Sequence, residues 1–306
     1  MSTIFSQTDS QQNEHIKIEN LLYELIEKNR GMDNISLTNS EKLFEYDLNK
    51  VFFKIKECYQ EEDENVKAAL QILTISIGSE TNDLKLKKET TNLLLKSIST
   101  ADIGLFQRGL KALQNYNEED FDKQAKTQLS EYIEKYRAKP YNRIISLIGV
   151  ANLKSETDYL KSIVNQCKQE ASVVELSDLK LSKGSVCWSA IAALARMGDK
   201  HSIEYILHWI KFFEYDLIAT KAQFKALAYI RQPEIVDYFK TQILSEEFSI
   251  THNTKSYIAF AAMNLIDDML EDFPITPKKR VYSIEDLPLV REWIKDKTLE
   301  DYKIIK

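Results

Sequence analysis

The chain has 306 residues, of which 43% are hydrophobic and 29% charged, and its net charge is −6 at pH 7. With only 7 Gly and 5 Pro, it lacks the many tight turns that an all-β fold needs. The acidic balance disfavours a nucleic-acid binder, which usually presents a positive surface to the phosphates. No run approaches the roughly 18 apolar residues of a membrane span, so we expect a cytoplasmic protein with no membrane contact.

The first part of the chain predicts a polar tail and two helices. Residues 1–13 are polar, so we expect a disordered N-terminal tail. They also lack the basic start and the apolar stretch of a secretory signal. Apolar residues at three-and-four spacing then predict a helix that ends near Gly31. Ser40 is a candidate N-cap for the next helix.

Further along, the apolar spacing predicts helices in pairs, each pair joined by a short turn. A polar stretch at 168–183 interrupts the series as an insertion. After the pairs we expect a helix over 255–270, a break at 273–277, a short helix from Ser283 and a C-terminal tail at 297–306. The pairs are predicted at residues 66–77 and 84–98, 106–116 and 121–136, 144–151 and 157–167, 186–197 and 202–213, and 218–230 and 233–244.

The register of these pairs indicates a repeat. Ala-Leu or an equivalent apolar pair recurs at spacings of 33 to 46 residues, and an acidic residue followed by Tyr recurs early in the second helix. A helix–turn–helix unit at such a spacing is typical of an α-solenoid. The apolar pairs are Ala69-Leu70, Ala112-Leu113, Leu147-Ile148, Ala193-Leu194, Ala226-Leu227 and Ala262-Met263, and the Tyr residues are Tyr159, Tyr205 and Tyr238.

One unit carries a family resemblance. The segment AIAALARMGD, which ends at Gly198-Asp199, followed by SIEYI from Ser202, resembles the first helix, turn and second helix of a HEAT repeat. In the neighbouring copies Gly198 is replaced by Asn152 and Arg231. The resemblance implies an all-α fold: a right-handed α-solenoid of about five to six HEAT-like repeats in one domain over 14–296. HEAT and armadillo units are not separated by these residues.

The second helix of that unit supplies the candidate binding residues. Ile203, Ile206 and Ile210 share one face, while a second stripe of aromatic residues lies on another. If HEAT-like geometry holds, this stripe faces either the concave surface, where aromatic residues make good anchors, or the core between repeats. The candidate partner-binding residues are Tyr205, Trp209, Phe212 and His208, together with Tyr159 and Tyr238 at equivalent positions.

Metal and catalytic chemistry have little support. Cys58, Cys167 and Cys187 form no CxxC pair, and we interpret them as reduced thiols in a reducing compartment, which also favours a cytoplasmic location. His201 and His208 lack further ligands at zinc spacing, and the carboxylates of 267–272 fit a solvated helix end. The run 277–280 is basic but short. No nucleophile, P-loop or dinucleotide motif is present, so we expect no cofactor and no metal.

Two functions stay open. The first is a non-catalytic interaction or scaffold protein that binds a protein or peptide on the concave face of the solenoid. The second is an enzyme, because some HEAT-like proteins resemble DNA glycosylases and Arg196 and Lys211 lie near the aromatic stripe. The absence of a basic stripe favours the first. The sequence identifies neither the partner nor the oligomeric state.

Overall fold

The computed structural model confirms the all-α class: every named element in the described residues is a helix, and one isolated β-bridge joins Leu270 and Ile304. The chain divides into two compact units, Met1–Lys135 and Tyr136–Lys306, and each is described by itself. The structure describes residues 2–29, 40–59, 64–98, 103–176, 179, 185–210, 224–245, 253–275, 282–283 and 285–306, without the side chains of residues 2–12, 28–29, 40, 64–65 and 253–257.

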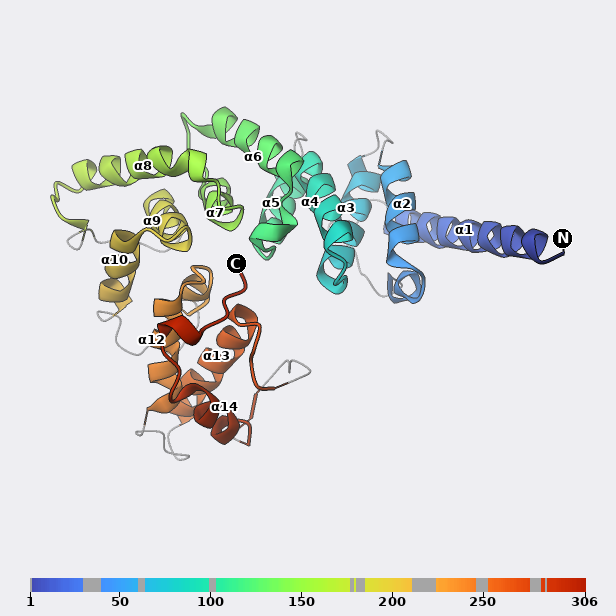
Figure 1. Cartoon of the computed structure of the whole chain (residues 1–306). Helices are drawn as coiled ribbons and strands as arrows, with labels where there is room; N and C mark the ends of the chain where they lie inside the picture. The colour runs from blue at the N-terminus through green and yellow to red at the C-terminus, as the bar shows by residue number, and fades with distance from the viewer. Residues whose placement is uncertain are drawn as a thin grey trace. The chain divides into compact units, whose positions relative to one another are not determined.

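The first unit is a series of helices in which α2, α3, α4 and α5 lie side by side (Figure 1). The central helix α3 packs against α1, α2, α4 and α5. The helices are α1 (Ser2–Asn29), α2 (Leu48–Cys58), α3 (Glu64–Glu80), α4 (Leu84–Ser97), α5 (Ile103–Leu113) and α6 (Lys123–Tyr136), with 3-10 turns at Ser40–Glu45 and Glu118–Asp120.

Helix α1 contacts its neighbours through an apolar stripe. Ile18, Leu22, Leu25 and Ile26 are buried against the core of the unit, as their spacing predicts. The helix begins at Ser2, so it also covers the residues that their polar composition assigned to a disordered tail. The start of the helix therefore lies well before the expected boundary.

Aspartate side chains cap the first turns of α2, α4 and α6. Asp47 accepts a hydrogen bond from the Asn49 N–H before α2, and Asp83 accepts from Lys85 and Leu86 before α4. Asp122 Oδ1 accepts from the Ala125 N–H, 2.8 Å away, at the start of α6. Such caps satisfy amide groups that have no partner inside a helix, each worth about 1 kcal/mol.

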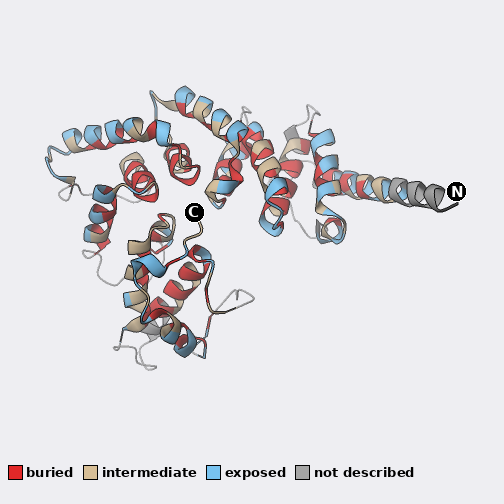
Figure 2. Ribbon diagram, viewed as in Figure 1, coloured by how far each residue is buried: buried red, intermediate tan, exposed pale blue. Residues whose placement is uncertain are grey.

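The second unit is built around α9. Figure 2 shows α9 and α7 largely in the colour of buried residues, and all residues of α9 from Trp188 to Arg196 are buried. Helices α7, α8 and α10 pack around it. The elements are α7 (Asn142–Val150), α8 (Thr157–Glu170), α9 (Val186–Arg196), α10 (Lys200–Ile210), α12 (Pro233–Leu244), α13 (Asn253–Met269) and α14 (Leu287–Ile294), with 3-10 turns at Lys154–Glu156 and Leu299–Asp301 and a helical segment at 224–228.

The turns at Asn152, Gly198 and Arg231, which the repeat pattern aligns with one another, share one backbone conformation. Gly198 has φ of 90°, and Asn152 and Arg231 both have φ of 50°. After α7 and α9 the hydrogen bonds also match, because the amides of Leu153 and Asp199 donate to carbonyls five residues back. This left-handed turn satisfies carbonyl groups at a helix end. The same conformation occurs at Ser172 after α8, with φ of 56° and a Val173 N–H that donates to Lys168 O, so this turn is a common helix end in the second unit and does not by itself mark a repeat.

The interpretation of all three cysteines as reduced thiols is wrong. Cys167 in α8 and Cys187 in α9 form a disulfide with their Cα atoms 6.2 Å apart, and Cys58 lies outside it. The two residues are 20 positions apart, across the predicted insertion, so no short motif marks the pair. The expected cytoplasmic location relied in part on reduced thiols, and that part of its support is lost.

Residues 297–306 pack against other parts of the second unit, although their sequence predicted a tail. The Ile305 N–H donates to Met269 O at 2.9 Å, and the Glu271 N–H donates to Lys303 O at 3.0 Å. Tyr302 is 7% exposed, and burial together with the nearby Asp237 carboxylate raises the pKa of its hydroxyl. Because the pairing is made by backbone groups, apolar spacing could not reveal it.

The left-handed turn at Gly198 generates a first prediction. Replacing Gly198→Ala lowers the free energy of unfolding by about 1–2 kcal/mol, because a side chain disfavours this conformation. No atom lies within 4 Å of the added Cβ, so the effect comes from the backbone alone. The matched control is Gly198→Asn, since Asn tolerates the left-handed region. Urea denaturation measures both, and equal losses would contradict the assignment.

The disulfide generates a second prediction. Titration of the unfolded, non-reduced chain detects one thiol, from Cys58, and three after reduction. Cys167→Ser lowers stability by about 3 kcal/mol, because the bridge no longer restricts the unfolded chain, whereas Cys58→Ser has a smaller effect. Three thiols before reduction would show that the bridge does not form.

Candidate functional site

The aromatic residues predicted to anchor a partner are buried in the described structure. Trp209 is 7% exposed and packs on Trp188, with 4.5 Å between ring centroids. Tyr205 is 3% exposed, and its hydroxyl donates to the Leu179 carbonyl at 2.5 Å. Burial raises the pKa of Tyr205 to about 12, which keeps this donor protonated. Of the two alternatives, core packing is the one that this burial supports.

The other predicted residues have separate surroundings. Tyr159 is half-buried, and the Arg137 guanidinium lies 4.4 Å from its ring centroid. Tyr238 is half-buried and forms an edge contact with Phe224. His208 is exposed on α10, and Phe212 lies outside the described residues. The described residues of this set therefore do not form one continuous aromatic surface.

The charged residues considered for chemistry are mostly engaged in the fold. Arg196 is 9% exposed and donates to Tyr229 O at 2.5 Å, so it is not presented to a phosphate. Of the carboxylates expected at a solvated helix end, Asp268 and Glu271 are exposed, but Asp267 is buried and accepts from the Tyr282 hydroxyl at 2.7 Å. No metal-binding group of three or more His, Cys, Asp or Glu occurs within the described parts of the chain. Lys211 and the basic run 277–280 lie outside them.

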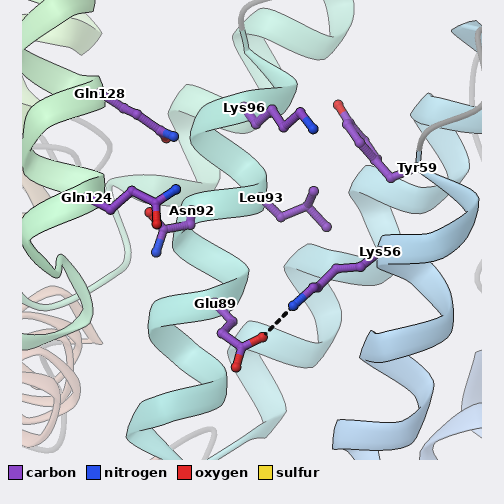
Figure 3. A pocket seen from close by; sticks show the side chains of 8 residues that line it. All are labelled: Lys56, Tyr59, Glu89, Asn92, Leu93, Lys96, Gln124 and Gln128. Atoms are coloured by element: carbon purple, nitrogen blue, oxygen red, sulfur yellow. Dashed lines mark hydrogen bonds and ion pairs between the residues drawn. The ribbon is translucent and has the colours of Figure 1, made fainter.

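A cavity of about 430 Å³ in the first unit brings three alternate helices together. Figure 3 shows its side chains arriving from α2, α4 and α6, with Gln124 and Gln128 extending from α6 towards α4. Most of its lining residues carry polar groups, Leu93 is the aliphatic one, and the stems of the long side chains add further apolar surface. The lining residues are Lys56, Tyr59, Glu89, Asn92, Leu93, Lys96, Gln124 and Gln128.

A second cavity of about 340 Å³ continues the first along α4 and α6. Lys96 and Gln128 belong to both linings, so the two cavities adjoin. We call the combined depression the α2/α4/α6 groove. Its remaining residues are Leu95, Glu131, Tyr132 and Lys135.

The groove carries both signs of charge. Lys56 Nζ lies 2.8 Å from Glu89 Oε2, and the side chains of this pair are 46% and 37% exposed. Across the whole lining, the basic residues Lys56, Lys96 and Lys135 face the acidic residues Glu89 and Glu131. Such a lining is not the positive surface that binds nucleic acid through its phosphates.

Two residues that line the groove each have a buried amide oxygen with no hydrogen-bond partner among the described residues. They are Asn92 Oδ1 and Gln128 Oε1, and both atoms are shielded from water. Asn92 is held in place, because its Nδ2 donates to Lys88 O and to Asp122 Oδ2, each at 3.0 Å. A shielded acceptor without a partner costs about 1–3 kcal/mol, and because neither oxygen has accessible surface, a ligand in the groove does not reach either of them in this conformation.

The sequence did not lead us to predict the groove, because we expected aromatic residues to form the binding surface. The signal is a polar stripe at three-and-four spacing on α4 and α6, with Leu93, Leu95 and Tyr132 among the other groove residues on these helices. It includes Glu89, Asn92 and Lys96 on α4, and Gln124, Gln128, Glu131 and Lys135 on α6. Such stripes usually mark solvated helix faces, and only the folded structure shows that these two line the same cavities.

Comparisons of this chain with models of protein families, with curated proteins and with solved structures find no match. Among the described residues, no helix has the length and apolar character needed to cross a membrane. The functional argument therefore depends on the residues of this chain.

The burial of Trp209 generates a third prediction. Trp209→Ala lowers the free energy of unfolding by about 3–5 kcal/mol, because it removes a buried ring and leaves a cavity beside Trp188. His208→Ala, on the exposed face of the same helix, changes it by less than about 0.5 kcal/mol. Urea denaturation compares the two. A fully stable Trp209→Ala variant would contradict the packing interpretation.

Proposed function

We propose that this chain is a non-catalytic interaction or scaffold protein that binds a protein or peptide partner in the α2/α4/α6 groove. Its helix pairs belong, in this proposal, to a right-handed α-solenoid of about five to six HEAT-like repeats. The left-handed turns at Asn152, Gly198 and Arg231 fit this repeat but, since Ser172 shares their conformation, do not establish it. In such an array alternate helices line one surface, which is available to a partner.

The observation that carries the proposal is the polar groove made by alternate helices. Asn92, Gln124 and Gln128 are carboxamides, which donate and accept hydrogen bonds but serve poorly as nucleophiles or as general acids and bases. They lie beside lysine and glutamate side chains along two adjoining cavities. This composition suits recognition of a polar chain rather than catalysis.

In this proposal the binding site is the groove and not the aromatic stripe. Partner binding through Tyr205 and Trp209 would require these side chains to leave the core, because they are 3% and 7% exposed. Lys96 and Gln124 are exposed in the folded chain. The groove can therefore meet a partner without unfolding of the second unit.

A charge reversal tests this proposal. Lys96→Glu reduces capture of partners from source-cell lysate by tenfold or more, because Lys96 belongs to both cavities and the reversal repels groups that it attracts. The matched control is Lys111→Glu, an identical change at an exposed position on α5, which leaves capture unchanged. Quantitative mass spectrometry of the captured proteins measures the difference.

Capture that is equal in the native chain and in both variants would overturn the groove as the binding site. Thermal unfolding of each variant provides the stability check. Because Lys96 and Lys111 are both exposed, neither reversal is expected to change stability by more than about 0.5 kcal/mol.

A further inference from the structure

The outward face of α1 carries exposed apolar side chains. Helix α1 lies at one end of the helix series in the first unit (Figure 1) and packs against α2, α3 and the 3-10 turn at Ser40–Glu45. Away from this packed face, Ile16 and Tyr23 are 51% and 46% exposed and lie about two helical turns apart. Phe53 of α2 is 51% exposed and stacks on His15, the residue before Ile16. Exposed apolar side chains that are grouped in this way, and not scattered singly, mark a candidate contact surface.

The exposed residues of α1 form one stripe with two unlike edges. At about 100° per residue they fall within an arc of about 120° that is centred on Asn20. Ile16 and Tyr23 lie along one edge of this arc, and Lys17 and Glu24 lie along the other. The stripe therefore has an apolar edge and a charged edge. Within 13–27 the exposed residues are Asn13, Ile16, Lys17, Asn20, Tyr23, Glu24 and Glu27.

The stripe complements itself when two copies of α1 meet antiparallel. The midpoint between Ile16 and Tyr23 and the midpoint between Lys17 and Glu24 both fall beside Asn20. A two-fold axis at Asn20 therefore places Ile16 against Tyr23 of the second copy on one edge, and Lys17 against its Glu24 on the other. The axis also brings the two Asn20 side chains together, and a carboxamide can donate to and accept from its own copy.

A parallel pair lacks this match. It would place Lys17 beside Lys17 and Glu24 beside Glu24, so that like charges repel. The antiparallel pair overlaps over residues 13–27, which is about four helical turns or roughly 22 Å. Because the axis repeats every contact, the pair gains two Ile16–Tyr23 contacts and two Lys17–Glu24 ion pairs.

We propose that two copies of this chain associate through the outward face of α1, as an antiparallel helix pair with its two-fold axis at Asn20. Ile16 and Tyr23 supply the apolar contacts, and Lys17 and Glu24 set the direction of the pairing. None of these residues lines the α2/α4/α6 groove. The proposal therefore goes beyond the proposed function and does not rest on it.

Sedimentation velocity of the full chain at about 1 to 200 µM tests the association. We expect the mass to rise with concentration from the 35.6 kDa of one chain towards twice that value. In Lys17→Glu and in Glu24→Lys like charges meet twice across the axis, so each change raises the Kd of the dimer about tenfold. The matched control is Lys111→Glu at an exposed position on α5, which leaves this Kd unchanged.

The double variant Lys17→Glu/Glu24→Lys tests the direction of the pairing. It exchanges the two charges, so opposite charges meet again and the Kd returns to within about twofold of the native value. This rescue requires residue 17 of one chain to meet residue 24 of the other. Ile16→Ser raises the Kd about tenfold through the apolar edge, and the charge exchange does not rescue it.

The mass of a single chain at every concentration would overturn the proposal. Association that neither single charge reversal weakens would also overturn it, because the dimer would then use another surface. A double variant that associates as weakly as the single variants would contradict the antiparallel pairing. Thermal unfolding checks that each variant folds like the native chain, as expected for changes at exposed positions.

Discussion

The enclosure of α9 is the constraint on which the second unit depends. From Trp188 to Arg196 every residue of this helix is buried, so no face of it can meet water. Helices α7, α8 and α10 must therefore be present together, and the Cys167–Cys187 bridge holds α8 to the start of α9. Helices α7 and α9 also approach each other closely at Gly149, because a Cβ at that position would lie 2.9 Å from the Ala193 Cα.

Side-chain hydrogen bonds join the ends of neighbouring helices in the same unit. The Gln232 amide donates to the Arg196 carbonyl at 2.7 Å, and the Arg196 side chain donates to the Tyr229 carbonyl at 2.5 Å. A helix end leaves carbonyl groups that have no partner inside the helix. Here Gln232 of the next helix pair satisfies the one at Arg196, so the end of α9 is also joined to the next pair.

Much of the fold could be predicted from the sequence, because helix positions depend on local apolar spacing. The helix pairs and the turn at Gly198 follow from such spacing, whereas the left-handed conformation of Asn152, Ser172 and Arg231 was not predicted. The disulfide and the packed C-terminal segment could not be predicted, since both join residues that no local pattern connects. Tyr205 and Trp209 show the limit for sites: their wheel position permits groove or core, and only the cover from Leu179 and Trp188 distinguishes them.

The C-terminal segment also has a consequence for how this protein is made. Arg231 donates to the Ile305 carbonyl at 3.0 Å, and the Lys240 ammonium donates to the Lys297 carbonyl at 2.6 Å. The ribosome synthesises residues 231 and 240 before the segment 297–305 that they contact. Domains generally fold as units during synthesis, so this unit gains these contacts only after that segment has left the ribosome.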